Sequence, residues 1–405
     1  METDEYILED MKTRTLLILA LSYANQDDSF FGGNFVKNQV HALKGYFKRI
    51  IVIAPVLRSF GYLEKEKLCT DYIDDNVEVY FPRCWYIPVF WRSKIPIGNR
   101  QKVVENTIKH HRIHFDLIHA HFTWPSGYIG VMLKKEHGIP LVTTIHENSR
   151  LFDQEVRISN PLINRAWSDA DALIRVNRKD IPVLKHYNER VFSIPNGFSS
   201  SFYRIDTMVA RERLGLPQEV KILFTLGVLI KRKGFNFLID AMEQICRHRE
   251  DVLCYIGGAG EEKDNLQRQI NQLQLGEKVH LLGLVPNDDL PLWMNGCDLF
   301  VLPSLGEGNP TVMFEALGCG KPFIGTRVGG VPEIITSEVY GLLVEPADAS
   351  DLAEKITMAL NREWDREKIL VYAQQFTWEN IAKNIVDVYA LVLESNAGHE
   401  VKPER

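Results

Sequence analysis

Two glutamates eight residues apart, Glu307 and Glu315, flank a turn that contains a proline. The apolar run at 299–302 predicts a buried strand, and Pro310 predicts the first residue of a helix, a position where proline is favoured. The free amides in the first turn of such a helix bind phosphate. An anion site between two carboxylates suits a ligand with phosphate in its middle and hydroxyl groups at both ends, as in a nucleotide sugar.

A basic turn follows another apolar run in the second half of the chain. Leu226-Gly227 is followed shortly by Lys231, Arg232 and Lys233. Three cations between a strand and a helix could neutralise a diphosphate, since ammonium and guanidinium groups suit phosphate oxygens. The alternative is a solvated basic turn. The later glycine turn around Gly258 has small residues that fit a nucleobase or pyrophosphate lying on the backbone.

A glycine pair, Gly32-Gly33, follows the first predicted strand. The pattern is not the dinucleotide fingerprint, and no acidic residue ends the second strand where a ribose contact would be needed. The glycines could let backbone amides approach a phosphate or an acceptor. A plain loop pair explains them equally well.

Three histidines lie at the ends of two predicted strands. Strand alternation places His119 and His121 on one face, and His146 ends the next strand at the same edge of the sheet. Two histidines one residue apart could bind a metal, but no third ligand is close in sequence, so we expect no metal. Histidines at such an edge are more often functional than core residues, which makes His146 a candidate on the acceptor side.

The segment 84–94 combines aromatic residues with Trp91, Arg92 and Lys94. Such a mixture suits an interfacial contact with a lipid-linked acceptor, so Trp91 and Arg92 are further acceptor-side candidates. The alternative is a partly buried loop between a strand and the next helix.

Short apolar runs alternate with helical patterns along the whole chain, which predicts two doubly wound parallel sheets. The first half predicts strands at Thr15–Ala20, Arg49–Ala54, Val77–Phe81, Asp116–His121, Pro140–His146, Ala172–Val176 and Val191–Ile194, with helices near 34–47, 101–112, 126–137 and 177–188. The second half predicts strands at Lys221–Leu226, Val252–Ile256, Val279–Leu282, Asp298–Leu302, Pro322–Gly325 and Gly341–Val344, with helices near 235–248, 260–273, 287–295, 311–319 and 350–361.

A turn-rich segment at 194–201 separates the two series of strands. We therefore expect two Rossmann-like α/β domains, an acceptor-binding one over 1–198 and a donor-binding one over 199–377. The last helix, near 378–395, is predicted to pack back on the first domain. Ligands of such sheets bind at the carboxyl ends of the strands, which predicts a cleft between the domains.

Composition narrows the class of protein. The 405 residues carry a net charge of −6 and no dense basic stripe, which argues against nucleic-acid binding. The six cysteines show no metal-ligand spacing, so we expect a reduced, cytoplasmic chain. The run from Met11 resembles a signal peptide, but a buried first strand before a glycine loop explains it better. The sequence contains no run of about 20 apolar residues, so we expect no membrane-spanning helix.

These motifs together resemble glycosyltransferase family 4, retaining enzymes of the GT-B fold, over residues 15–395. Glu307 and Glu315, with seven residues between them, match the family's EX7E signature. Four more motifs stand in the family's usual order: the IPNG turn at 194–197, KG at 233–234, GGAG at 257–260 and GGVPE at 329–333.

The resemblance implies roles for the matching residues. Glu315 would hold the ribose hydroxyls of the donor nucleotide, and Glu307 would face the hydroxyls of the donor sugar. The remaining loop residues would lie along sugar and phosphate with their backbone: Gly308, Asn309, Pro310 and Thr311.

By the same resemblance, His121 would contact the transferred sugar near the reacting centre, and Lys233 would bind the diphosphate. Gly32 and Gly33 would form the loop that closes over the site. One departure concerns Val228, which stands where the family commonly has a second arginine for the diphosphate. Lys231 or Arg232, in the same turn, could replace it.

The implied reaction moves a hexosyl unit from a UDP- or GDP-linked sugar to an acceptor hydroxyl and retains the anomeric configuration, without a metal. A glycolipid, a lipid-linked oligosaccharide or a polysaccharide precursor of the cell envelope would be the acceptor, with peripheral contact at the membrane. Two alternatives stay open: a nucleotide-sugar epimerase or hydrolase of the same fold, and a non-catalytic nucleotide-sugar-binding subunit.

Overall fold

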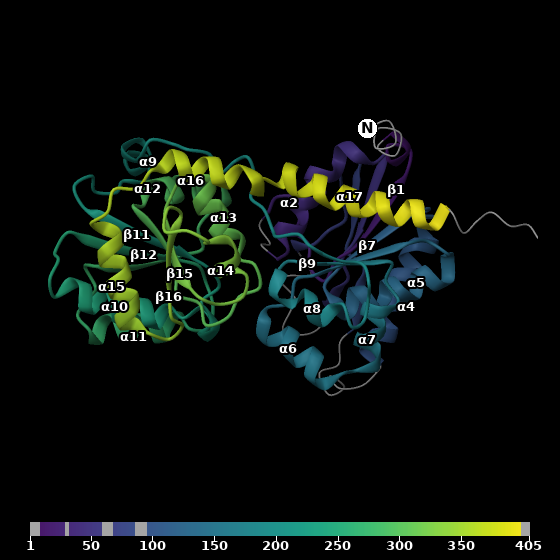
Figure 1. The fold of residues 1–405 in the computed structure, drawn as a ribbon, viewed down its shortest axis with the longest axis horizontal. Coiled ribbons are helices and arrows are strands. Elements are labelled where there is room, and N and C mark those ends of the chain that lie inside the picture. Colours follow the sequence, from purple (N-terminus) through teal and green to yellow (C-terminus); the bar gives the residue numbers. More distant parts are fainter. Residues whose placement is uncertain (1–8, 29–31, 59–67, 86–94, 398–405) are drawn as a thin grey trace, which may run out of the picture. The chain divides into compact units, whose positions relative to one another are not determined.

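The computed structural model describes residues 9–28, 32–58, 68–85 and 95–397, and within these the chain forms two compact units (Figure 1). Unit 1 comprises the chain up to Glu147, the segment Leu151–Pro195 and the chain from Ile381 onward. Unit 2 comprises Asn148–Arg150 and Asn196–Asn380. The two units are described separately below.

Unit 1 is built on a sheet with the strand order β10-β9-β8-β7-β1-β2-β5-β4. All neighbouring strands are parallel except β4, which pairs antiparallel with β5 at the edge. The strands are β1 (Thr15–Leu19), β2 (Arg49–Ile53), β4 (Tyr72–Asp74), β5 (Val77–Tyr80), β7 (Leu117–His121), β8 (Leu141–Ile145), β9 (Ala172–Arg175) and β10 (Val191–Ser193), and a separate small sheet pairs β3 (Val56–Arg58) with β6 (Arg83–Trp85).

The central strands β7 and β8 are buried at every position, because helices cover both faces of a parallel sheet. The helices of this unit are α2 (Asn34–Leu43), α4 (Ile95–His110), α5 (Tyr128–His137), α6 (Ser149–Ile158), α7 (Pro161–Ser168) and α8 (Ile181–Leu184). The last helix, α17 (Trp378–Ala397), places Tyr389 in the core of unit 1, where its ring lies 5.8 Å from that of Phe47.

Unit 2 is built on a fully parallel sheet with the order β13-β12-β11-β14-β15-β16. Its strands are β11 (Lys221–Leu226), β12 (Val252–Gly257), β13 (Val279–Gly283), β14 (Leu299–Leu302), β15 (Phe323–Thr326) and β16 (Gly341–Val344). Its helices are α9 (Thr207–Leu214), α10 (Phe235–Cys246), α11 (Lys263–Gln272), α12 (Leu290–Gly296), α13 (Thr311–Gly318), α14 (Val331–Ile334), α15 (Ala349–Leu360) and α16 (Arg366–Ala373).

Successive side chains of β11 enter two different cores, as strand alternation requires. Leu223 belongs to the core cluster that contains residues of α10, α11 and α15, whereas Ile222 and Phe224 belong to the cluster that contains residues of α12, α13 and α16. Because all strands of this sheet run parallel, the loops that follow the strands gather at one edge of the sheet, and the segments that precede them gather at the opposite edge.

Several boundaries differ from the sequence-based expectation. Pro310 is the N-cap residue of α13, with an extended backbone, and the helix begins one residue later at Thr311. The helix expected at 177–188 is only the single turn of α8 after a short 3₁₀ turn. The helix expected near 287–295 begins at Leu290. Among the described residues, no helix is both long enough and apolar enough to cross a membrane.

Candidate active site

The basic turn after β11 packs directly on the loop after β14. Gly234 has a φ of 65°, and a Cβ there would lie 2.1 Å from the carbonyl oxygen of Pro303. The amide of Leu305 donates a hydrogen bond to the carbonyl of Arg232 at 2.8 Å. Glycine is therefore required at this position, because only a residue without a side chain lets the two loops approach so closely.

This approach brings Glu307 into contact with two cations. Its Oε1 accepts hydrogen bonds from Lys233 Nζ at 2.7 Å and from the Ser304 hydroxyl at 2.6 Å. Its Oε2 lies 3.2 Å from a terminal nitrogen of Arg232. Glu307 is 5% exposed; burial alone would raise its pKa, but the charges of Lys233 and Arg232 outweigh that effect and hold the pKa below its usual value. Glu307 is therefore an ionised, buried carboxylate.

The sequence suggested that Glu307 and Lys233 make separate contacts with the donor. In the structure they form one ion pair. Of the other two cations, Arg232 reaches Glu307, whereas Lys231 is exposed and makes no ion pair with any described residue. Val228 is 58% exposed. Arg232 is therefore the basic residue of this turn that joins Lys233.

Two glycines lie in the turns that follow β11 and β12, and the first of them lies close to the Lys233 side chain. A Cβ on Gly258, whose φ is 136°, would lie 1.9 Å from the carbonyl oxygen of Gly227. A Cβ on Gly227 would lie 3.3 Å from the Lys233 Cε. Packing between the two strand-end turns therefore explains the glycine at 258, and the Lys233 side chain lies against Gly227.

The loop before α13 is held by a pair of asparagines. The side-chain oxygen of Asn309 accepts a hydrogen bond from the Asn196 amide at 2.8 Å, and the Asn196 side chain donates to the Asn309 carbonyl at 2.7 Å. The Asn309 side-chain nitrogen is buried and has no acceptor among the described residues. Gly308 accepts the amide of Gly330 at 2.7 Å. These hydrogen bonds hold the loop of Gly308, Asn309 and Pro310 in place directly before Thr311, the first residue of α13.

Glu315, on α13, differs from Glu307 in its surroundings. Its side chain is partly exposed, and no described residue donates a hydrogen bond to it or pairs with its charge. Burial raises its pKa to about 7, because the charged form loses water without gaining a partner. A carboxylate in this state is available to hydroxyl groups of a ligand.

In unit 1, Gly33 is the N-cap residue of α2. Its φ is 85°, and a Cβ there would lie 2.2 Å from the carbonyl oxygen of Ser22. The need for glycine at Gly33 therefore comes from the close approach of the chain after β1. Gly32 precedes it and is partly exposed.

The three histidines form a connected row at the ends of β7 and β8. His119 is hydrogen bonded through Nδ1 to the Tyr389 hydroxyl at 2.6 Å and through Nε2 to the Thr144 hydroxyl at 2.7 Å. His121 Nδ1 lies 3.0 Å from His146 Nε2, and the two rings are stacked. The expected placement of His119 and His121 on one face agrees with their ring separation of 4.3 Å.

These histidines are neutral in the structure. Burial lowers the pKa of all three, and that of His121 falls to about 3. His121 Nε2 and His146 Nδ1 are buried and have no hydrogen-bond partner among the described residues. One proton must lie between the paired nitrogens, so His121 Nε2 can make one further hydrogen bond in either tautomer.

Sequence reasoning missed a buried acid next to His146. Glu147 Oε1 accepts the amide of Thr123 at 2.8 Å, while its Oε2 has no partner among the described residues. Burial raises the pKa of Glu147, and burial together with the charge of Glu147 raises the pKa of Glu155 to about 9. The position of Glu147, directly after a strand-end histidine, was the only signal in the sequence.

Two candidates, Trp91 and Arg92, lie outside the described residues. Within the described ranges, no three or more His, Cys, Asp or Glu side chains gather closely enough to hold a metal ion.

Comparisons with known proteins agree with this architecture. Residues 206–376 match the family model described as glycosyl transferases group 1, and residues 35–202 match that described as glycosyltransferase family 4. Among solved structures, sucrose-phosphate synthase from Thermosynechococcus elongatus is similar with a TM-score of 0.76 and 21% identity, covering 94% of this chain and all of that one. HepE of Anabaena, solved with UDP, has a TM-score of 0.69 and 23% identity, covering 93% and 100%.

Similar sequences are glycosyltransferases by name. TuaC of Bacillus subtilis, named for a provisional role in teichuronic acid biosynthesis, is 30% identical over 341 residues, which cover 80% of this chain and 84% of TuaC. D-inositol 3-phosphate glycosyltransferase 1 of Catenulispora acidiphila is 27% identical, with 70% and 74% covered. The chain therefore belongs to the group 1 glycosyltransferases of the family 4 type, enzymes with the GT-B fold.

Proposed function

We propose that this glycosyltransferase moves a hexosyl unit from a UDP- or GDP-linked sugar to an acceptor hydroxyl, with retention of the anomeric configuration. The observation that carries the proposal is the contrast between the two glutamates of unit 2. Glu307 is neutralised by cations, whereas Glu315 is a partly exposed carboxylate without a partner among the described residues. The similar protein HepE was solved with UDP and with UDP-glucose, which supports a nucleotide-sugar donor.

In this proposal, Glu307 positions Lys233 for the diphosphate. An ammonium group has three N–H donors, and Glu307 accepts one of them, so two can reach phosphate oxygens. Arg232 adds a second cation, in the role that Val228 cannot fill. These charges, together with the amides at the start of α13 near Thr311, would stabilise the leaving diphosphate without a divalent ion. Full activity in excess EDTA is the result that this assignment requires.

The resemblance to retaining transferases implies retention, and the contacts assigned to the two glutamates bear on how retention is achieved. Retaining glycosidases employ one of two carboxylates as a nucleophile, but here both glutamates are assigned to other contacts. We therefore assign same-face attack. The acceptor oxygen bonds to the anomeric carbon as the bond to the phosphate oxygen breaks, and that phosphate oxygen takes the acceptor proton. An inverted product, read from the anomeric proton coupling in an NMR spectrum, would contradict this assignment.

Membership in a transferase family favours transfer over the two alternatives, a donor epimerase or hydrolase and a non-catalytic binding subunit. Incubation of labelled donor without acceptor separates them. A transferase leaves nearly all the donor intact, whereas rapid formation of an epimer or of free sugar would favour the first alternative. Binding without turnover for any acceptor would favour the second.

We further propose a glycolipid, lipid-linked oligosaccharide or polysaccharide precursor as acceptor, contacted by unit 1. TuaC supports a cell-envelope polysaccharide, since its name refers to teichuronic acid. His146, Trp91 and Arg92 are the acceptor-side residues. We also propose a cytoplasmic site of action, at the inner face of the membrane; the spacing of the six cysteines, which matches no metal-ligand pattern, is consistent with a reduced compartment.

Membrane contact through Trp91 and Arg92 predicts co-sedimentation with anionic liposomes that falls several-fold in the Trp91→Ala/Arg92→Ala variant. The aromatic ring and the cation would both be lost from the interface. Arg268→Ala, an exposed arginine on α11, is the matched control and should sediment like the wild type. Equal, negligible sedimentation of all three proteins would reject the membrane contact.

The assignment of Glu315 to the ribose predicts that donor affinity depends on pH. Ribose hydroxyls bind the ionised carboxylate best, and with a pKa of about 7 only about a tenth of Glu315 is ionised at pH 6. The Kd of the nucleotide sugar should therefore rise about tenfold between pH 8 and pH 6. Titration calorimetry measures this, and Glu315→Gln should bind weakly at both pH values.

The same substitution should stabilise the free protein at alkaline pH. Burial raises the Glu315 pKa from 4.5 to about 7, so the folded chain keeps a proton that the unfolded chain releases within that window. Stability therefore falls as the pH rises through it, by up to about 3 kcal/mol. At pH 8.5, Glu315→Gln should have a higher Tm than the wild type without donor. A lower Tm combined with unchanged donor affinity would remove Glu315 from the site.

A further inference from the structure

A cavity lies in unit 2 at the edge of the sheet opposite the donor loops. Its volume is about 320 Å³, and it is lined by the residues that precede β11, β14 and β15 or begin them, and by the segment between α15 and α16. Pockets for small molecules start at about this volume. Strands of four to six residues separate it from the turn at Lys231 and from Glu307, a length of about 15–20 Å.

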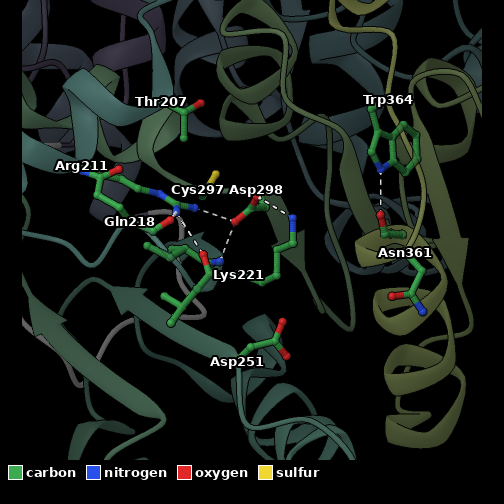
Figure 2. A network of polar contacts seen from close by, with 12 residues as sticks. Thr207, Arg211, Gln218, Lys221, Asp251, Cys297, Asp298, Asn361 and Trp364 are labelled. Atoms are coloured by element: carbon green, nitrogen blue, oxygen red, sulfur yellow. Dashed lines mark hydrogen bonds and ion pairs between the residues drawn. The ribbon is translucent and has the colours of Figure 1, made fainter.

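Cations outnumber carboxylates among the charged side chains that line this cavity. Lys221, Arg362 and Arg366 line it together with two carboxylates, Asp298 and Glu363. One of these carboxylates, Asp298, is already neutralised by an arginine that does not line the cavity. Asp298 Oδ2 accepts a hydrogen bond at 2.6 Å from Arg211, whose side chain is only 5% exposed (Figure 2).

The other hydrogen bonds of Arg211 hold its guanidinium group against Asp298. Its remaining nitrogens donate to the carbonyls of Gly296, Gln218 and Val220 at 2.8–3.0 Å. Asp298 also accepts the amide of Ile222 at 2.7 Å, so the carboxylate is held on the protein side of the cavity. The three lining cations therefore face a single uncompensated carboxylate, that of Glu363.

The cations are placed so that their donors stay available. The Lys221 side chain is 43% exposed, and its Nζ lies 3.6 Å from Asp298 Oδ1, longer than a hydrogen bond (Figure 2). Arg362 lies over the Trp364 ring, 4.6 Å from its centre, and the indole N–H is occupied by the Ala359 carbonyl at 2.9 Å. Stacking of this kind fixes the guanidinium plane and leaves its edge of N–H donors free.

The other contact of Arg362 is weak. Its partner Glu338 is 78% exposed at 3.5 Å, and exposed pairs of this kind contribute little. A planar guanidinium and a lysine ammonium that line the same cavity match the oxygens of a phosphate group. Trp364 adds an apolar surface on which a ring can rest.

We propose that this cavity binds the phosphate group of a small phosphorylated molecule, at a site separate from the donor loops. Lys221 and Arg362 are the side chains that contact the phosphate. Arg366 is tied to the Thr207 hydroxyl at 2.9 Å and contributes mainly its charge.

The test is calorimetric titration of the whole protein with a hexose 6-phosphate, with inorganic phosphate and with the unphosphorylated hexose. UDP and GDP are present at saturating concentration, so that the donor loops are occupied. We expect the hexose phosphate to bind and the hexose not to bind. Equal affinity for inorganic phosphate would identify the ion itself as the ligand, and tighter binding of the hexose phosphate would identify the ring as part of it.

Matched variants locate the site. Arg362→Gln should raise the Kd about tenfold or more, and Lys221→Gln/Arg362→Gln further, because charge-assisted hydrogen bonds are lost. Arg268→Gln, the same change on exposed α11, should leave the Kd unchanged. The proposal is overturned if the wild type does not bind at millimolar phosphate, if UDP or GDP abolishes binding, or if Arg268→Gln weakens it equally. None of these results would affect the assignment of the donor loops.

Discussion

The Glu307→Gln variant is expected to lose about 10²–10³-fold in kcat/KM and about 3–5 kcal/mol of unfolding free energy. Glu307 is the common partner of Lys233, Arg232 and the Ser304 hydroxyl, at 2.7, 3.2 and 2.6 Å. Glutamine keeps the shape of the side chain but removes the charge that compensates two neighbouring cations. Breaking one half of a buried ion pair is costly for this reason. An unheld Lys233 also loses the position from which it would reach the leaving diphosphate.

Stability and activity can be separated with a second substitution. Lys233→Met alone leaves Glu307 buried with one cation fewer, so it should also destabilise the protein. The double variant Glu307→Gln/Lys233→Met removes both charges and should recover most of the unfolding free energy, because replacing a whole buried pair is often nearly neutral. It should recover none of the activity.

Urea unfolding and steady-state kinetics with saturating acceptor measure the two quantities. Glu243→Gln is the matched control: Glu243, on α10, pairs with exposed Arg247, the residue just after the helix, a contact that contributes only a few tenths of a kcal/mol. A Glu307→Gln variant that keeps wild-type kcat/KM would remove the ion pair from the catalytic site, whatever its stability.

This ion pair shows where sequence reasoning was sufficient and where it stopped. The strands were predictable because β14 is a continuous apolar run and β11 is mostly apolar, as buried parallel strands are. Both glutamates and the basic turn were predictable as candidates. Their contact was not, because it depends on β14 lying next to β11 in the sheet although β12 and β13 intervene in the chain.

Smaller elements escaped prediction for other physical reasons. β4 is three residues long, lies at the sheet edge and is partly exposed, so it lacks the apolar run of its neighbours. Helix α7 had a readable start, since the Asn160 side chain accepts the amide of Leu162 and Pro161 follows it. Its eight residues gave too short a periodic pattern to be recognised. The role of Glu147 depends on contact with the Thr123 amide, which only the folded chain creates.

Replacing His121 by asparagine is the second change with a large expected effect, a loss of about 10²–10³-fold in kcat. His121 is fully buried, and its Nε2 has no hydrogen-bond partner among the described residues, although buried polar atoms are nearly always paired. A hydroxyl of the transferred sugar is the partner we propose. A hydrogen bond of this kind made in the transition state has about this effect on the rate. The donor Kd should change much less, since Glu315 and the basic turn belong to other contacts.

The pH dependence of kcat distinguishes this role from acid–base catalysis. A catalytic base titrating near neutrality would give kcat an inflection between pH 5 and 8, whereas burial lowers the His121 pKa to about 3 and keeps the ring neutral over that range. At saturating donor, kcat of the wild type should therefore show no inflection from His121, and His121→Asn should be slow by the same factor at every pH. His186→Asn, at an exposed histidine of unit 1, should match the wild type throughout. A wild-type inflection that disappears in His121→Asn would instead make His121 a proton-transfer residue, and the burial that sets its pKa would have to be relieved when substrate binds.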